Sequence, residues 1–217
     1  MAHYFENDGM AQSDEKKIKV VIKDELFTFV TDHNVFSKSG LDFGTRTLLE
    51  SIDVNELKGN ILDFGCGYGP IGIYLGRYKL NVDMVDINLR ALNLARKNAD
   101  LNRVKVNIFE SNIYANVTKK YDYIITNPPI RVGKKILYDI LFGAQTHLVE
   151  GGHLILVIHK DQGAKSLTKD LEKSYQVKIL QKNKGFYVID CYNTLTSWLQ
   201  FDKIINWWHV YFIHSRN

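Results

Sequence analysis

A glycine-rich segment, ILDFGCGYGPIG over residues 61–72, constrains the fold of this chain more than any other feature. It joins an apolar, strand-like run to a helical pattern, with Gly65, Gly67 and Gly69 at every second position. Glycine allows a sharp turn and, because it lacks a Cβ, lets a ligand come close to the backbone. The spacing differs from the GxGxxG of dinucleotide-binding domains, which disfavours a NAD-dependent dehydrogenase. The segment therefore indicates an α/β fold with a cofactor site at this turn.

Two carboxylates accompany the glycine loop. Asp63 stands two residues before Gly65, where an acid is poorly placed beside a pyrophosphate but well placed to attract a cationic amino-acid group. Asp86 ends the next apolar run, where a carboxylate can accept hydrogen bonds from both hydroxyls of a ribose. A tight turn with a capping acid is the alternative, but the strand context and Asp86 favour a cofactor site.

Strand-like and helix-like runs alternate from residue 60 onward. Continuous apolar strands joined by helices indicate a parallel sheet covered on both faces. The last two strands are separated by a short turn, which predicts an antiparallel pair. Two earlier runs, 18–23 and 25–31, predict an N-terminal β-hairpin, and a short helical pattern follows over 47–52. The expected strands of the sheet are 60–64, 82–86, 104–109, 121–126, 151–158, 176–181 and 185–192, and the expected helices after the glycine loop include 89–102, 134–149 and 164–175.

The segment Asn127-Pro128-Pro129-Ile130 follows a strand-like run and is expected at the same sheet edge as the glycine loop. Consecutive prolines fix the backbone and remove two amide donors, which leaves their carbonyl groups directed outward. The Asn127 amide oxygen and the Pro128 carbonyl can then accept the two hydrogens of an NH2 group and turn its lone pair toward an electrophile. Such a transfer needs neither a metal nor a strong base. A strand-terminating turn is the structural alternative.

These motifs, DFGCGYG (63–69), DIN (86–88) and Asn-Pro-Pro, resemble those of the class I S-adenosylmethionine-dependent methyltransferases. The resemblance implies a Rossmann-like seven-stranded sheet, mostly parallel with an antiparallel last strand, and helices on both faces. It implies S-adenosylmethionine as the cofactor, S-adenosylhomocysteine as the product and a catalytic role for residues 127–130. Asp63 and the glycine backbone would face the methionine part, Asp86 the ribose and Asn112 the adenine amine. The residues assigned to the cofactor are Asp63, Gly65, Cys66, Gly67, Gly69, Asp86, Ile87, Asn112, Ile113 and Asn127, with Cys66 interpreted as a packing residue.

A closer resemblance covers about residues 18–190. FTFVTDHNVFSKSGLDFGTRTLLESI (27–52), NPPIRVGK (127–134) and HKDQGAKS (159–166) are similar to the RsmC-like ribosomal RNA methyltransferases, in a short single-domain form. This resemblance implies methylation of the exocyclic N2 of a guanine in small-subunit rRNA, with Phe36, Lys38 and Thr45 near the cofactor. The chain departs from the family pattern at Asn34, and Ile130 offers an apolar face where many relatives place an aromatic ring.

The net charge of +4 is unevenly distributed. Residues 119–184 hold 12 Lys and Arg against 6 Asp and Glu, a net +6, so the remainder sums to −2. Arg131, Lys134 and Lys135 directly follow the Asn-Pro-Pro segment, where an RNA backbone would pass, and Lys38 is a further candidate contact. The charge pattern supports an RNA substrate modestly.

We expect a flexible lead-in over 1–17, a methyltransferase domain over 18–192 and an aromatic-rich extension over 193–217. Within the domain, 18–59 would form the hairpin and a lid-like segment, and 60–192 the sheet core. Only two cysteines and a polar N-terminus predict a cytoplasmic protein without a membrane span or a metal site. The expected partner is ribosomal RNA or the small ribosomal subunit. An adenine-N6 or protein-glutamine methyltransferase, and a non-catalytic RNA-binding or ribosome assembly factor, stay open as alternatives, as does the oligomeric state.

Overall fold

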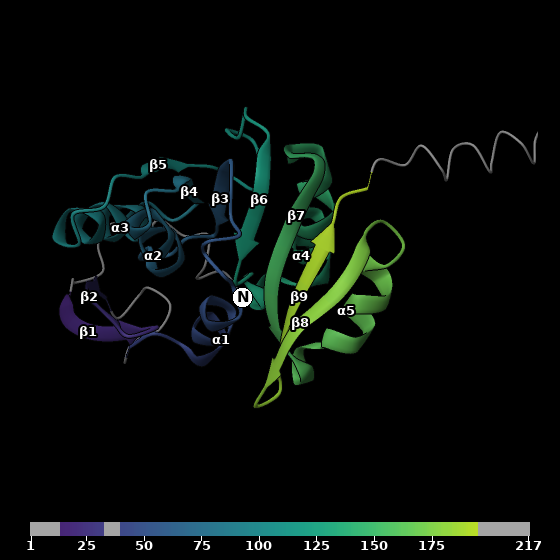
Figure 1. Ribbon diagram of the computed structural model, residues 1–217, viewed down its shortest axis with the longest axis horizontal. Coiled ribbons are helices and arrows are strands. Elements are labelled where there is room, and N and C mark those ends of the chain that lie inside the picture. The colour runs from purple at the N-terminus through teal and green to yellow at the C-terminus, as the bar shows by residue number, and fades with distance from the viewer. Residues whose placement is uncertain (1–13, 33–39, 195–217) are drawn as a thin grey trace, which may run out of the picture.

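A seven-stranded sheet forms the centre of the computed structural model, which describes residues 14–32 and 40–194. Its strand order is β5-β4-β3-β6-β7-β9-β8, from left to right in Figure 1. β9 runs antiparallel to β7 and β8, and the other neighbouring pairs are parallel. The predicted sheet, mostly parallel with an antiparallel last strand, is therefore confirmed. The strands are β3 Asn60–Phe64, β4 Asn81–Asp86, β5 Asn107–Glu110, β6 Tyr121–Thr126, β7 Leu148–His159, β8 Gln176–Asn183 and β9 Phe186–Tyr192.

The direction in which the chain adds strands reverses between β3 and β6. From β3 it proceeds outward through β4 and β5, and then returns to place β6 on the other side of β3. In open α/β sheets, ligands bind in the crevice outside the carboxyl ends of the strands at such a reversal. The glycine loop follows β3 and the Asn-Pro-Pro segment follows β6, so both begin at this point.

Two apolar cores cover the two faces of the sheet, as expected for a layered α/β fold. One contains buried side chains of α1, α2, α3 and the hairpin, and the other those of α4 and α5. None of the helices that the structure describes is long and apolar enough to cross a membrane. The helices are α1 Phe43–Ser51, α2 Pro70–Arg77, α3 Leu89–Leu101, α4 Lys134–Gly143 and α5 Ala164–Leu171, with short 3-10 helices η1 Ile130–Val132, η2 Ala144–His147 and η3 Lys160–Gln162.

Several element boundaries differ from those expected. The helix predicted over 134–149 ends at Gly143, and β7 begins as early as Leu148, because Leu148 pairs with Tyr121 of β6 and is buried. The helix predicted over 47–52 begins at Phe43, because Asp42 caps its N-terminus by accepting a hydrogen bond from the Thr45 amide. The predicted helix over 164–175 ends at Leu171 and the predicted strand over 104–109 starts at Asn107.

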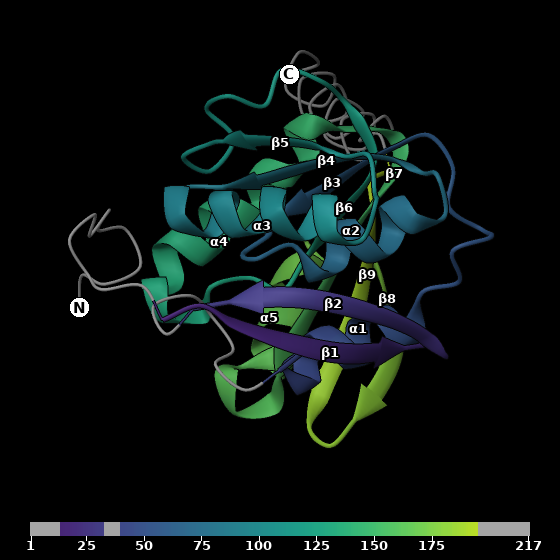
Figure 2. The same cartoon turned by 90° about the vertical axis from the view of Figure 1, so that its left-hand side faces the viewer.

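The N-terminal hairpin, β1 Lys16–Ile22 with β2 Glu25–Thr31, forms a separate two-stranded sheet beside α3 (Figure 2). Asn98 of α3 and Asn102, the C-cap residue of this helix, take the place of a third strand. Asn98 accepts from the Val30 amide at 2.6 Å and donates to the Val30 carbonyl at 2.9 Å. Asn102 makes the same pair of bonds with the Thr28 backbone, at 3.1 and 2.7 Å. The edge of β2 is thus satisfied by side-chain amides four residues apart in the sequence.

Candidate active site

The glycine loop leaves open space beside its backbone. Gly65 and Gly67 have φ values of +68° and +56°, and a Cβ built on either would meet no atom within 4 Å. Gly69 has a different role, because a Cβ there would lie 2.8 Å from Ile73 and 3.0 Å from Met84. The first two glycines therefore shape a cradle and the third lets α2 pack closely on the sheet.

Asp63 lies directly under this loop at the end of β3 and is fully buried. Its Oδ2 accepts a hydrogen bond from the Gly72 amide at 2.8 Å, whereas its Oδ1 has no hydrogen-bond partner among the described residues. Burial, with a smaller contribution from the Asp86 charge, raises the pKa of this carboxyl to about 7, although the hydrogen bond from Gly72 lowers it. A buried carboxylate oxygen without a donor fits the ammonium group of an amino-acid moiety.

Asp86 ends β4 and holds the loop in place. Its Oδ2 accepts from the Gly67 amide and its Oδ1 from the Asn88 amide, both at 2.9 Å. Burial raises the pKa of Asp86, and these amide bonds oppose that shift. Each carboxylate oxygen has a second lone pair, so the group fits a pair of ribose hydroxyls as well as the loop.

A small cavity joins the glycine loop to the Asn-Pro-Pro segment. The predicted residues Gly65, Asp86, Ile87, Ile113 and Pro129 all line it. Its apolar walls suit the flat face of an adenine ring.

Two other predicted cofactor residues do not line this cavity. Asn112 is exposed, although its neighbour Ile113 lines the wall. Cys66 is buried, and burial raises the pKa of its thiol well above the ordinary value, which agrees with a packing residue and not a nucleophile.

Ser111 is a residue that the sequence analysis missed. It is buried at the end of β5, donates from Oγ to the Ile113 carbonyl at 2.9 Å and accepts from the Asn116 amide at 3.2 Å. Ile113 has a φ of +51°, an outlier for a β-branched residue. Ser111 thus stabilises the strained turn that directs Ile113 into the cavity wall.

Among the residues that the structure describes, the Asn127 side chain is held through its amide nitrogen only. Its Nδ2 donates to Asp42 Oδ1 at 3.1 Å and to Thr45 Oγ1 at 3.0 Å. Both N–H groups are therefore used, and the amide oxygen is left as an acceptor. Asp42 was not among the predicted residues. An Asp just before a helical pattern is a sequence signal for a helix N-cap, which is the position that Asp42 has at α1.

The remaining predicted residues are only partly brought together. Pro128 is buried, and Ile130 packs at the border of the second core. Lys134 and Lys135 are exposed at the start of α4, where Lys135 pairs with Asp139 at 2.8 Å. The side chain of Arg131, and Phe36, Lys38, 1–13 and 195–217, lie outside the described part of the chain.

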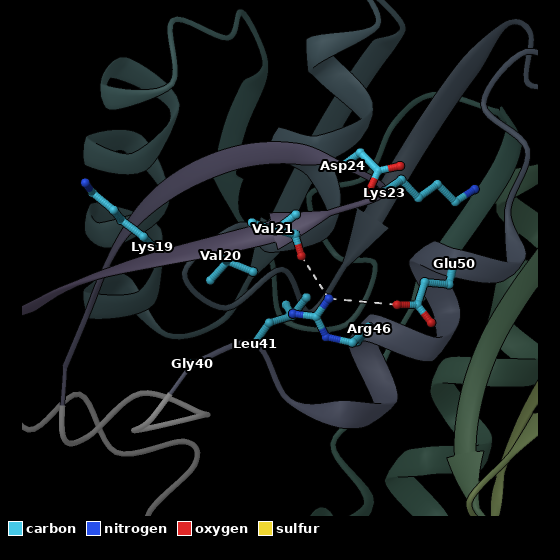
Figure 3. A pocket seen from close by; sticks show the side chains of 9 residues that line it. All are labelled: Lys19, Val20, Val21, Lys23, Asp24, Gly40, Leu41, Arg46 and Glu50. Atoms are coloured by element: carbon cyan, nitrogen blue, oxygen red, sulfur yellow. Dashed lines mark hydrogen bonds and ion pairs between the residues drawn. The ribbon is translucent and has the colours of Figure 1, made fainter.

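A larger cavity of about 560 Å³ lies elsewhere, between the hairpin and α1 (Figure 3). Arg46 crosses it, donating to the Val21 carbonyl at 2.8 Å and lying 3.8 Å from Glu50. None of the predicted cofactor residues within 14–32 and 40–194 lines it. The motifs, and not the volume, therefore locate the candidate active site.

Known proteins resemble this chain over most of its length. The model of the family described as "Methyltransferase small domain" matches residues 26–190. The "Uncharacterized protein YbxB" of Bacillus subtilis is 40% identical over 193 residues, which cover 86% of this chain and 96% of that protein. "Ribosomal RNA small subunit methyltransferase C" of Haemophilus influenzae is 35% identical over 159 residues, 70% of this chain and 48% of that protein. This chain spans about half the length of the relatives with that name.

Among solved structures, the 16S rRNA N2 methyltransferase RsmC of T. thermophilus, in complex with AdoMet and guanosine, superimposes with a TM-score of 0.76. It is 24% identical and the match covers 84% of this chain and 51% of that chain, so it shows a shared fold. The family match and the identities confirm the resemblance found in the sequence. The chain belongs to the methyltransferase small domain family of S-adenosylmethionine-dependent methyltransferases.

Proposed function

We propose that this chain methylates an exocyclic amine, namely the N2 amine of a guanine in small-subunit, 16S-type ribosomal RNA. The observation that carries the proposal is the one-sided anchoring of Asn127, whose amide oxygen stays available beside the glycine loop. The relatives named for small-subunit rRNA methylation support guanine N2 as the acceptor. The same resemblance supports a cytoplasmic enzyme that works on RNA or on the small ribosomal subunit.

In this proposal, each part of the cofactor is held by different residues around the crevice. S-adenosylmethionine supplies a methyl group on a positively charged sulfur. Asp63 Oδ1 would hold its ammonium group, and Asp86 its ribose hydroxyls. The cradle of Gly65 and Gly67 would take the methionine backbone, while Cys66 and Gly69 pack the loop that forms it. Ile87 and Ile113, with Asn112 at the rim, would hold the adenine.

Asn127 and Pro128 orient the acceptor. The Asn127 amide oxygen and the Pro128 carbonyl would each accept one N–H of the amine, which turns the nitrogen lone pair out of conjugation with the ring. Fixed acceptors of this kind stabilise the positive charge that develops on nitrogen without reorganising. Water then takes the proton, so the chain needs no strong base.

Asp42 and Thr45 are positioning residues for Asn127. A flipped amide would place its oxygen about 3 Å from the Asp42 carboxylate, where two acceptors repel each other. The observed orientation is therefore enforced, and the Asp42 charge also favours a cation at the acceptor. Arg131, Lys134 and Lys135, with Lys38, would contact the RNA backbone.

The deciding experiment is to deplete the protein, map the methyl groups lost from ribosomal RNA, and restore either the wild type or Asn127→Ala. We expect one guanine N2 mark to disappear and to return with the wild type alone. Persistence of all rRNA marks would overturn the rRNA proposal, and methylation of an adenine or a glutamine by the purified protein would replace it. Recovery of ribosome assembly with Asn127→Ala, without any lost mark, would indicate a non-catalytic assembly factor.

A further inference from the structure

Four side chains next to the Asn-Pro-Pro segment form a cluster that the proposed function does not use: Phe43, His159, Lys184 and Phe186, here called the Phe43 patch. The rings of Phe43 and Phe186 lie 5.7 Å apart, and those of His159 and Phe186 lie 4.8 Å apart. The Lys184 ammonium lies 5.0 Å from the centre of the Phe43 ring. The three rings are half-buried and Lys184 is exposed.

Two glycines make the close packing of the patch possible. A Cβ on Gly44 would lie 2.9 Å from the Phe186 ring, and one on Gly185 would lie 2.5 Å from His159 Nε2. Gly185 also has a φ of +86°. The His159 side chain and backbone form a capping box at η3, which fixes this ring further. The patch is thus a defined arrangement of rings.

The patch lies beside the catalytic residues. Phe43 directly follows Asp42, whose carboxylate accepts from Asn127. His159 ends β7 and pairs with Phe186 at the start of β9, while β6 ends at Thr126, level with Leu156 of β7. The rings therefore stand at the same carboxyl edge of the sheet as Asn127, displaced toward β7 and β9. In Figure 1 the turn between β8 and β9 is at the lower end, next to α1.

Lysines border the rings, whereas the Asp42 carboxylate beside Phe43 accepts hydrogen bonds from Asn127 and from the Thr45 amide. Lys160 and Lys184 are both exposed there, and the Lys160 amide donates to the Gly185 carbonyl at 2.7 Å. The Asp161 carboxylate lies 3.4 Å from His159 Nδ1 and is 75% exposed, so it points largely to solvent. Aromatic rings with cations at their border are the means by which proteins bind single-stranded nucleic acid, because bases stack on the rings and lysines meet the phosphates.

We propose that the Phe43 patch binds a nucleotide that flanks the target base in a single-stranded stretch of RNA. The flanking base stacks on the exposed side of the Phe43 and Phe186 rings, and Lys184, with Lys160, neutralises the adjoining phosphate. This inference rests on the proposed function for the place of the target base. It gives the RNA an aromatic contact outside the target-base site, where Ile130 has no π-system.

The test measures binding of a fluorescent single-stranded RNA of about 15 nucleotides by anisotropy, at several salt concentrations and without methyl transfer. We expect Phe43→Leu to weaken binding roughly 5- to 100-fold, because stacking is lost while apolar packing is kept. Lys184→Ala should lower the slope of log affinity against log salt by about 0.7, the value for one contact to a single-stranded phosphate.

Matched controls come from the other side of the molecule. Phe142→Leu changes another half-buried ring, which lies 5.5 Å from Tyr138, and Lys169→Ala removes an exposed charge of α5. Both should bind RNA like the wild type, and all four variants should keep the affinity for S-adenosylmethionine and the melting temperature.

Wild-type affinity in Phe43→Leu and an unchanged salt slope in Lys184→Ala would overturn the inference, as would no RNA binding by the wild type. Persistence of rRNA marks after depletion would overturn the proposed function alone, because this assay does not depend on methylation.

Discussion

At the scale of single residues, the burial of Asp63 should make the free energy of unfolding depend on pH. Burial raises the pKa of its carboxyl from 3.8 to about 7, so folding favours the protonated form. Between these values the unfolded chain holds fewer protons than the folded one, and the free energy of unfolding falls as pH rises. We expect Asp63→Asn to remove this contribution, up to about 1.4 kcal/mol per pH unit. Urea unfolding of both proteins without cofactor from about pH 5 to 8 measures it, and identical pH profiles would contradict it.

The same carboxyl should make cofactor binding depend on pH. An ammonium group favours the ionised carboxylate, so below the pKa of about 7 binding must first expel a proton. We expect the affinity for S-adenosylmethionine to rise up to tenfold per pH unit between about pH 5.5 and 7 and then to level off. Calorimetry in buffers of different ionisation enthalpy will detect the released proton. Asp63→Asn should bind weakly and without this slope, and a slope that survives the substitution would refute the assignment.

Thr45 and Thr47 offer a matched pair for testing how Asn127 is positioned. Both are buried threonines of α1, but Thr45 Oγ1 accepts from Asn127, whereas Thr47 Oγ1 donates to the Phe43 carbonyl. Thr45→Val leaves one N–H of Asn127 unpaired, and we expect kcat to fall about tenfold with little change in cofactor affinity. Thr47→Val should lose similar stability and keep kcat. Equal losses of kcat in the two variants would show that Thr45 has only a structural role.

The sequence identifies the Asn127 side chain but not what holds it. Asn-Pro-Pro after a strand is a local pattern, so it can be read from neighbouring residues. Asp42 is 85 residues away, and its contact with Asn127 exists only because α1 packs beside the end of β6. Ser111 escaped notice for a different reason: its bond to the Ile113 carbonyl is local, but the positive φ of Ile113 that it supports has no signature in the sequence.

At the scale of elements, strands with continuous apolar runs were predicted best. The bounds of β2, β3 and β6 match those predicted, because a buried strand has one apolar stretch and polar ends. The end of α4 was wrong, since Leu148 and Val149 continue the helical pattern of apolar residues and only pairing with β6 makes them strand. The docking of the hairpin on α3 through asparagines has no periodic signature and could not be predicted.

The Asn98 side chain joins α3 to the hairpin and to the glycine loop. Its side chain is fully buried, bonds both backbone groups of Val30 and donates to the Tyr68 carbonyl of the glycine loop at 2.8 Å. Asn98→Ala leaves three buried backbone groups unpaired, and we expect a loss of roughly 2–4 kcal/mol in the free energy of unfolding. Asn93→Ala, at an exposed position of the same helix, should change stability by less than about 0.5 kcal/mol. Urea unfolding measures both, and equal effects would contradict the role of Asn98.

At the scale of the whole molecule, chemistry and charge meet at one edge of the sheet. The glycine loop, Asp86, the Asn-Pro-Pro segment and the Phe43 patch all follow carboxyl ends of strands or the turn beside them. The residues that carry the net +6 charge, 119–184, run from β6 to the turn after β8. Of their basic side chains, Lys134, Lys135, Lys160 and Lys184 follow the carboxyl ends of β6, β7 and β8, at the edge where the crevice opens, which favours a polyanionic substrate there.

Hydrogen bonds of Asn193 continue the described fold past Tyr192. The expected domain ended at residue 192, but the Asn193 amide donates to the Gly152 carbonyl at 2.8 Å and its carbonyl accepts from the Gly151 amide at 2.9 Å. Its side chain also donates to the Val149 carbonyl at 3.1 Å. These bonds extend the β9 ladder beyond Tyr192 and hold the start of β7.

We therefore expect a chain that ends at Thr194 to be more stable than one that ends at Tyr192. The shorter chain loses three hydrogen bonds of roughly 1 kcal/mol each, so its free energy of unfolding should be about 2–3 kcal/mol lower. Urea unfolding compares the two chains directly, and methyl transfer to rRNA from depleted cells compares their activity. A chain ending at Thr194 with Asn193→Gly is the matched control, because it restores the length and both backbone bonds but not the side-chain bond. It should fall between the two, and equal stability of all three would mean that the bonds of Asn193 do not stabilise the fold.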